Sequence, residues 1–309
     1  MIRTFNTHNI RPQKELTGSL WQFTPCQGEF SGKTYQVPTP SCWESYPDFT
    51  AYRGEGVYRT TFRAGGNIRL EFKGVSHTAV VTLDGKEIAS HYNAFTMFHA
   101  DVPGLEEGEH VLEIKADNRF SEDSALHIPN DYMTYGGITR PVVLEQVADV
   151  YVKWVHVTPC RCGSEWNAKI EVCLTNISDR EHTVNAETEL AGQTLCWENQ
   201  TVPAGQEIVL SAESAFPGAE TWAPESPVLY HVTVTVSENG AVIDDLIDRT
   251  GFREVKIEGK KILLNGRAIR IKGFCRHEDH PQFCCALPYQ AIAADLETAK
   301  HLGANSMRT

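Results

Sequence analysis

The sequence predicts a mainly β protein, in which two β-sandwiches precede the beginning of a parallel α/β fold. Apolar and polar residues alternate with period two from Trp21 to about Val147, and again from roughly Asp149 to Arg253. This alternation is typical of antiparallel strands with one buried face. After Gly251 a strand, a helix and a second strand follow one another, and this order is the repeating unit of a parallel sheet.

The first region, residues 1–148, is composed of short strands bounded by turn residues. Apolar side chains alternate with charged ones in residues 68–72 and again in residues 112–116. We therefore expect these strands to have one solvent-exposed face. The dipeptide Asp84-Gly85 supplies the positive φ angles of a type I′ hairpin turn. No amphipathic helix of useful length interrupts this region, which favours a β-sandwich.

The second region, residues 149–252, is again of β-sandwich size. It begins with alternating apolar residues at positions 150–154. The segment 222–230 contains too many prolines for a central strand, so we interpret it as a loop that leads into the last hairpin. Asn239-Gly240 is the predicted turn of that hairpin.

The third region, residues 253–309, opens with a hairpin whose turn lies at residues 265–266. A strand and then a helix follow. Pro288 suits the first turn of this helix, and Gly303 suits its C-terminal end. Residues 305–309 have the pattern of a further strand. Only one full strand–helix–strand unit is present, so we expect the sequence to end inside a domain.

Length and composition limit the classes of protein. The 309 residues suggest two domains and part of a third, and 41% hydrophobic with 22% charged residues indicates a folded, soluble chain. A net charge of −12 makes nucleic acid an unexpected partner. No apolar run approaches the roughly 20 residues that cross a bilayer, and residues 1–20 are too polar for a signal peptide. We expect no membrane partner and a cytoplasmic protein.

The nine cysteines are odd in number and irregularly spaced. Without an export signal, reduced thiols are the simplest interpretation. His156 with Cys160 and Cys162, and the pair Cys284-Cys285, lack the repeated ligand pairs of a zinc site. We therefore expect no metal and no cofactor.

Several short motifs occur in a fixed order along essentially the whole chain. Leu264-Asn-Gly-Arg267 runs into Lys272-Gly-Phe-Cys-Arg-His-Glu-Asp-His-Pro281, and Leu302-Gly-Ala-Asn-Ser-Met-Arg-Thr309 ends the sequence. Weaker motifs occupy residues 56–62, 81–86, 131–140, 222–230 and 251–253. Read in this order, they resemble the amino-terminal half of glycoside hydrolase family 2, which includes β-galactosidases, β-glucuronidases and β-mannosidases.

The resemblance implies three domains. These are a jelly-roll sugar-binding β-sandwich over residues 1–148, an immunoglobulin-like β-sandwich over 149–252, and the first βα unit of an incomplete (β/α)₈ catalytic barrel over 253–309. It also implies a carbohydrate substrate, and a homo-oligomer for the full-length protein.

The implied activity is that of a retaining exo-glycosidase, which hydrolyses O-glycosidic bonds. The motifs around His277 and at residues 303–309 are similar to those of β-glucuronidases, whereas His280-Pro281 is similar to β-galactosidases. We interpret the chain as part of a β-glucuronidase, with a β-galactosidase as the alternative. A third interpretation is a complete, non-catalytic carbohydrate-binding or subunit-bridging module, although a half-built barrel would then expose strand edges and apolar faces.

Retaining hydrolysis needs two carboxyl groups about 5 Å apart, one as acid/base and one as nucleophile. The resemblance implies that both glutamates lie on later barrel strands, beyond Thr309. We therefore assign no catalytic residue in this chain, and we expect the chain alone to be inactive.

Three residues match substrate-contacting positions of the family. The resemblance implies that Asp131 accepts hydrogen bonds from sugar hydroxyls, that His277 lies beside the cleaved bond at the end of the first barrel strand, and that Arg308 pairs with the nucleophile's carboxylate. The alternatives are structural. Asp131 could build a turn with Asn130, His277 could be a satisfied structural histidine or lie in a locally paired polar loop, and Arg308 could form an ordinary salt bridge.

Overall fold

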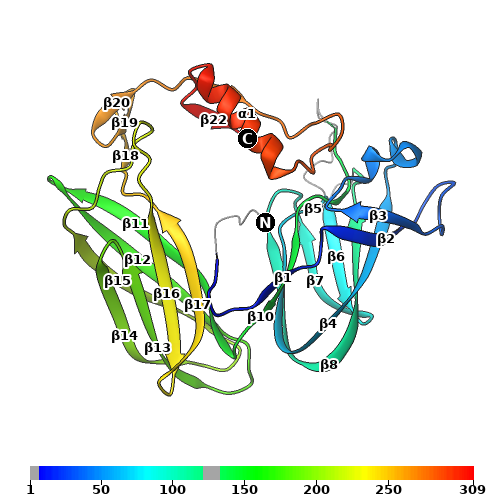
Figure 1. The fold of residues 1–309 in the computed structure, drawn as a ribbon, viewed down its shortest axis with the longest axis horizontal. Coiled ribbons are helices and arrows are strands. Elements are labelled where there is room, and N and C mark those ends of the chain that lie inside the picture. Colours follow the sequence, from blue (N-terminus) through cyan, green and yellow to red (C-terminus); the bar gives the residue numbers. More distant parts are fainter. Residues whose placement is uncertain (1–6, 121–132) are drawn as a thin grey trace. The chain divides into compact units, whose positions relative to one another are not determined.

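A computed structural model describes residues 7–120 and 133–309 of the chain (Figure 1). As the sequence predicts, the chain is mainly β, and within the described residues the one α-helix is α1 (Tyr289–His301). Close approaches of Cα atoms divide the chain into two compact units. Of the described residues, the first unit contains those within 13–146 together with 274–302 and 307–309, and the second unit contains 7–12, 147–273 and 303–306.

An eight-stranded sheet forms most of the first unit (Figure 1). Its strands are β1 (Gln13–Glu15), β2 (Ser19–Pro25), β3 (Tyr35–Thr39), β4 (Glu55–Phe72), β6 (Thr78–Leu83), β7 (Lys86–Tyr92), β8 (Phe98–Asp117) and β10 (Val142–Gln146). They run in the order β1-β10-β4-β8-β6-β7, and β2 pairs with both β3 and β4. The short strands β5 (Val75–Ser76) and β9 (Gly137–Ile138) pair with each other, and two 3₁₀ turns, η1 (Trp43–Ser45) and η2 (Pro47–Phe49), lie between β3 and β4.

The alternation predicted for residues 68–72 is only half correct. The three apolar side chains are fully buried, but Arg69 and Glu71 are also buried, each 6% exposed. The expected exposed face is wrong here, because both faces of β4 are covered at these positions. Glu145 on β10 places a carboxylate oxygen 3.3 Å from the Arg69 guanidinium. A charge pair thus replaces water on this face.

The second unit contains two sheets that share one core. One has β11 (Val150–Cys162), β12 (Glu165–Asn176) and β15 (Glu207–Phe216), and the other has β14 (Gln193–Val202), β13 (His182–Leu190), β16 (Tyr230–Glu238) and β17 (Ala241–Thr250). Buried side chains from both sheets meet between them, and the Phe252 ring lies 5.3 Å from that of Phe216 and 6.0 Å from that of Trp166. This is the immunoglobulin-like β-sandwich that the sequence predicts.

Residues 7–12 also pack in the second unit. Thr7 pairs with Ile247 on β17. The Arg11 guanidinium lies 2.8 Å from the Asp244 carboxylate, and both side chains are almost completely buried. These residues therefore pack against strand β17, which follows them by more than 200 positions.

The predicted hairpin turns adopt the expected left-handed backbone. Asp84 and Gly85 have φ angles of +50° and +81°, and Asn239 and Gly240 have +52° and +80°. Short polar side chains and glycine tolerate this conformation, so local chemistry fixes these turns.

The last residues form a small sheet and the single βα unit. Strands β18 (Val255–Glu258), β19 (Lys261–Leu264) and β20 (Arg267–Ile269) pair antiparallel. Strand β21 (Gly273–Cys275) pairs with β22 (Ser306–Arg308), and α1 lies between them in sequence. The helix is the predicted one, with Pro288 at its N-cap. None of the helices within the described residues has the length and apolarity that a membrane crossing needs.

Candidate functional site

His277 and Arg308 lie at neighbouring strand ends of the first unit. His277 follows β21 by two residues, and Arg308 is the last residue of β22. The backbone N–H of Arg276 donates a 2.8 Å hydrogen bond to the carbonyl oxygen of Arg308, which brings the two strand ends together. Both His277 and Arg308 are exposed. Asp131, the third predicted contact, lies outside the described residues.

Arg276 fastens this strand end to helix α1. Its guanidinium donates two hydrogen bonds, of 3.1 Å and 2.8 Å, to one carboxylate oxygen of Asp295 on α1. It also lies 3.6 Å from the Glu278 carboxylate. The backbone that carries His277 is therefore held on both sides by ionic contacts.

Residues 276–285, which we call the histidine loop, contact residues 133–140, which we call the glycine loop. The Arg140 guanidinium donates a 3.1 Å hydrogen bond to the Glu278 carboxylate. The Tyr135 hydroxyl hydrogen-bonds the Asp279 carboxylate. Burial and this hydrogen bond to Asp279 raise the pKa of Tyr135. The structure thus brings together two segments that the sequence separates by more than 130 residues.

Glu44 hydrogen-bonds the backbone of the glycine loop. Its Oε1 atom accepts hydrogen bonds from the Asn118 side-chain amide (2.8 Å) and the Gly136 backbone N–H (3.0 Å), and Oε2 accepts from the same N–H (3.0 Å). Burial raises the pKa of Glu44 to about 8, although the hydrogen bond from Gly136 lowers it. A buried carboxylate with few charged neighbours is favoured in its protonated form.

The close packing of Gly136 excludes any larger residue. A Cβ atom at this position would lie 1.9 Å from Cζ2 of Trp43. Trp43 itself is fully buried against Phe23 and Tyr52, with ring centroids 5.7 Å and 5.5 Å away. The glycine is therefore required for the backbone to approach the indole ring.

Sequence reasoning missed Glu44 and the Tyr135–Asp279 contact. Tyr135 lies in the sequence motif at residues 131–140, and this motif could have indicated that Tyr135 contributes to the site. Nothing in the sequence marks Glu44 as buried, because its partners Asn118 and Gly136 lie 74 and 92 positions away. The interpretation of residues 276–280 as a locally paired loop is correct for Arg276 with Glu278.

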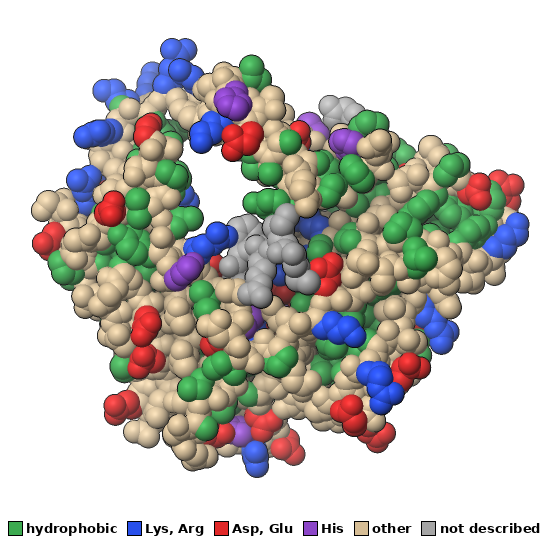
Figure 2. All heavy atoms as spheres, in the orientation of Figure 1, with side chains coloured by type: hydrophobic (Ala, Val, Ile, Leu, Met, Phe, Trp, Pro, Cys, Tyr) green, Lys and Arg blue, Asp and Glu red, His purple; other side chains and the backbone are tan. Residues whose placement is uncertain are grey.

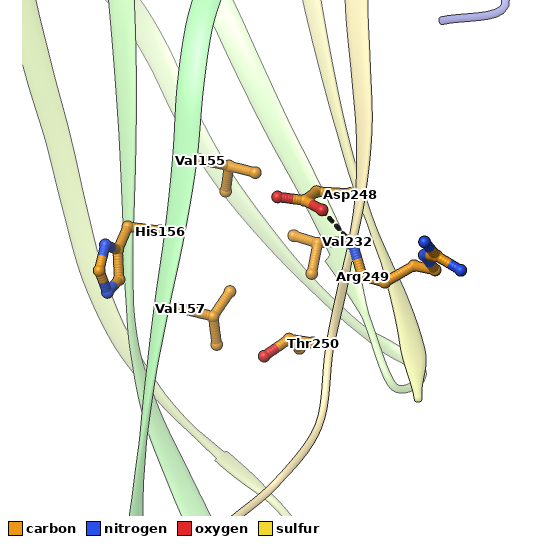
Figure 3. A pocket seen from close by; sticks show the side chains of 7 residues that line it. All are labelled: Val155, His156, Val157, Val232, Asp248, Arg249 and Thr250. Carbon is orange, nitrogen blue, oxygen red and sulfur yellow. Dashed lines mark hydrogen bonds between the residues drawn. The ribbon is translucent and has the colours of Figure 1, made fainter. Parts of the chain in front are cut away.

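A hollow of about 220 Å³ in the second unit lies between β11, β16 and β17 (Figure 3). Asp248 is the one carboxylate among its lining residues, and its carboxylate accepts a hydrogen bond from the Arg249 backbone (2.7 Å). The imidazole of His156 points to the opposite side of β11 (Figure 3). One carboxylate does not provide the pair that retaining hydrolysis needs.

Basic side chains gather on one part of the surface, away from this hollow. Acidic and basic side chains are interspersed on the face shown in Figure 2, apart from basic side chains that gather over β18–β20. Within residues 7–120 and 133–309, no group of three histidine, cysteine or acidic side chains is arranged to bind a metal ion. Cys160 and Cys162 are exposed free thiols.

Three family models match consecutive parts of the chain. The galactose-binding domain-like model of glycosyl hydrolase 2 matches residues 47–173, the model of glycosyl hydrolases family 2 matches 150–253, and its TIM barrel domain matches 255–309. These matches follow the order of the predicted domains.

Curated and solved proteins are similar to this chain over most of its length. A putative β-glucuronidase of Formosa agariphila is 27% identical, over 83% of this chain and 32% of its own. A β-galactosidase of Thermoanaerobacter pseudethanolicus is 26% identical, over 84% of this chain and 36% of its own. The solved β-galacturonidase from Eisenbergiella tayi, bound to galacturonate, is 49% identical with a TM-score of 0.94, over 100% of this chain and 56% of its own. The chain thus spans about a third of these curated relatives and about half of the solved one.

Proposed function

Because the chain belongs to glycoside hydrolase family 2, we propose that it is the amino-terminal part of a retaining β-glycosidase that removes β-linked uronic acids. The three matched models run from the galactose-binding-like domain to the start of the TIM barrel, and they support this placement. The proposed substrate is a β-galacturonide.

One observation favours the galacturonide over other sugars. The β-galacturonidase is 49% identical over the whole chain, whereas the β-glucuronidase and β-galactosidase relatives are 26–27% identical over about four fifths of it. Identity is therefore nearly twice as high to the β-galacturonidase as to these relatives. A β-glucuronide is the second candidate, because the motifs around His277 and at residues 303–309 are similar to those of β-glucuronidases.

In this proposal His277 and Arg308 lie at the mouth of the barrel. Their position at adjoining strand ends supports this role, since catalytic residues of (β/α)₈ barrels are held at the carboxyl ends of strands. The salt-bridged histidine loop and the Glu44-bound glycine loop hold the neighbouring backbone. Asp131 precedes the glycine loop by two residues, and we propose that it contacts sugar hydroxyls from there. The two catalytic carboxylates would be supplied by later barrel strands, so we propose that residues 1–309 alone are inactive.

The test compares hydrolysis of three p-nitrophenyl glycosides: the β-galacturonide, the β-glucuronide and the β-galactoside. Two proteins are assayed, the 309-residue chain and the product of its gene with any flanking coding sequence retained. We expect no turnover by the chain and preferential cleavage of the β-galacturonide by the longer protein. Equal or faster cleavage of the β-galactoside, which lacks the carboxylate, would contradict a uronide substrate. Turnover by the chain would contradict the assignment of the catalytic pair to later strands.

A variant of the longer protein tests the role of Arg308. Loss of a charged hydrogen-bonding group costs about 1.5–3 kcal/mol, so Arg308→Ala should lower kcat/KM by roughly ten- to a hundredfold. Arg267→Ala is the matched control, since it removes an exposed arginine from β20. An equal loss in both variants would contradict a specific role for Arg308.

A further inference from the structure

Three cysteine side chains meet in the first unit. Cys42 comes directly before η1 and is completely buried, whereas Cys284 and Cys285 lie in the histidine loop. The Sγ atoms of Cys42 and Cys285 are 3.4 Å apart, although 243 positions separate them in sequence. All three are free thiols. Two thiols from distant parts of the chain are therefore in contact.

The backbone on each side of the contact is fixed. His280 and Cys284 exchange two backbone hydrogen bonds, of 3.0 Å and 2.7 Å, which close a tight turn immediately before Cys285. Cys284 has a φ angle of +52°, in the left-handed region that few non-glycine residues adopt. On the other side, the backbone N–H and hydroxyl of Ser45 donate to the carbonyl oxygen of Cys42, at 3.2 Å and 2.7 Å. The thiols are therefore held near each other by their surroundings.

The distance to a covalent bond is short. A disulfide places its sulfurs about 2.05 Å apart, so the two Sγ atoms must approach by about 1.4 Å from their 3.4 Å separation. Cys285 is partly exposed, so its side chain can rotate to make most of this movement. Cys42 is buried and moves less easily. The Glu278–Arg140 and Asp279–Tyr135 contacts keep the rest of the loop in place.

The two buried thiols, Cys42 and Cys284, both have raised pKa values. Cys284 hydrogen-bonds Cys42 and lowers its pKa, but the hydrogen bond with Cys285 and burial raise it more, so that the pKa of Cys42 is well above its usual value. The hydrogen bond to Cys42 and burial also raise the pKa of Cys284. A protonated thiol reacts slowly with peroxide, so the first oxidation falls on the more exposed Cys285 rather than on Cys42 or Cys284.

We propose that Cys42 and Cys285 form an oxidative modification site, at which a peroxide converts the two thiols into a disulfide between η1 and the histidine loop. The more exposed Cys285 sulfur takes an oxygen atom from hydrogen peroxide, which gives a sulfenic acid and one water. The Cys42 sulfur then attacks this sulfur. The S–S bond forms and the S–O bond breaks. The hydroxyl group of the sulfenic acid takes the proton of the Cys42 thiol and leaves as a second water. In total the two thiols lose two electrons, and the peroxide gains them.

This site is independent of the proposed sugar specificity. The disulfide would tie the loop that carries His277 to the start of η1 in the first unit, whichever glycoside is cleaved. Cys284 is the neighbour that hydrogen-bonds Cys42 in the reduced state, and it is the alternative partner that an experiment must distinguish.

The test is peptide mapping of the 309-residue chain after treatment with hydrogen peroxide. The oxidised protein is denatured in N-ethylmaleimide and digested with trypsin without reductant, which places Cys42 in peptide 34–53 and both loop cysteines in peptide 277–300. We expect these peptides as a cross-linked pair, two hydrogens lighter than their sum, that dithiothreitol separates. Recovery of both peptides carrying only N-ethylmaleimide would overturn the proposal.

Variants assign the sulfur within peptide 277–300. Cys285→Ser should abolish the cross-link and Cys284→Ser should retain it. Both variants are first compared with the unmodified chain by circular dichroism, and a cross-link that persists in folded Cys285→Ser would overturn the assignment. Cys196→Ser is the matched control, because this exposed cysteine lies on β14 in the second unit and its loss should leave the cross-link unchanged.

Discussion

Replacing Glu44 by glutamine should change how the stability of the first unit depends on pH. Glu44 is 6% exposed and hydrogen-bonds the glycine loop at Gly136, and burial raises its pKa from 4.5 to about 8. The substitution keeps the size of the side chain and an oxygen that can accept from Asn118 and Gly136. It removes the only ionisable group that titrates at this position.

The magnitude follows from the two pKa values. The difference is 8 − 4.5 = 3.5 pH units, and at about 1.36 kcal/mol per unit this is about 5 kcal/mol of unfolding free energy. Because the folded-state pKa is the higher one, the folded protein retains its proton where the unfolded chain has lost it. The contribution is therefore complete below the unfolded value of 4.5 and is lost as pH rises towards about 8.

Scanning calorimetry at about pH 5.5 and about pH 8.5 measures this effect, because these values lie on either side of most of the transition. Between about pH 5.5 and the folded-state pKa the interval is 8 − 5.5 = 2.5 units, or about 3.4 kcal/mol. For a unit of this size about 1 kcal/mol corresponds to roughly 2–4 °C in Tm, so the Tm of the unmodified chain should fall by about 7–14 °C between the two pH values, and that of Glu44→Gln should not. Glu29→Gln, at an exposed position, is the matched control. An identical fall in Tm for the unmodified chain and Glu44→Gln would refute the reasoning.

Three further substitutions have effects that the packing determines. Arg11→Met leaves the Asp244 carboxylate buried without its guanidinium, so the second unit should lose about 3–5 kcal/mol, measured by its calorimetric transition. Phe252→Ala empties a fully buried site in the same unit and should cost about 3–5 kcal/mol in urea unfolding. Gly136→Ala places a Cβ against the indole of Trp43, so the first unit should lose about 1–3 kcal/mol and its near-ultraviolet circular dichroism should change. Losses below about 0.5 kcal/mol, the usual range for surface substitutions, would contradict these expectations.

The parts of the fold that sequence could predict are those that local chemistry decides. The Asp84-Gly85 and Asn239-Gly240 turns, the end of α1 before Gly303, and the β character of the first two regions each depend on residues close together in the chain. A turn or a helix end is set by backbone conformations that a few side chains favour, and no distant neighbour is needed.

The parts that sequence could not predict depend on which strands become neighbours. Arg69 was expected to face water, but it is buried and pairs with Glu145, which the neighbouring strand β10 supplies. The burial of Glu44 and the contact of Cys42 with Cys285 likewise join residues far apart in the chain. At the candidate site, the sequence motifs identified His277 and Arg308, but not the contacts that hold the backbone around them.

The attachment of residues 7–12 to β17 has a consequence for synthesis of the chain on the ribosome. Arg11 is made 233 residues before its partner Asp244. At translation rates of about 5–20 residues per second, this interval lasts roughly 10–50 s. During this interval the strands within residues 13–146 have time to pair. Residues 7–12 cannot form their contacts until β17 has been synthesised. A protein started after residue 12 would complete β17 with two buried aspartates, Asp244 and Asp245, deprived of these hydrogen-bond donors.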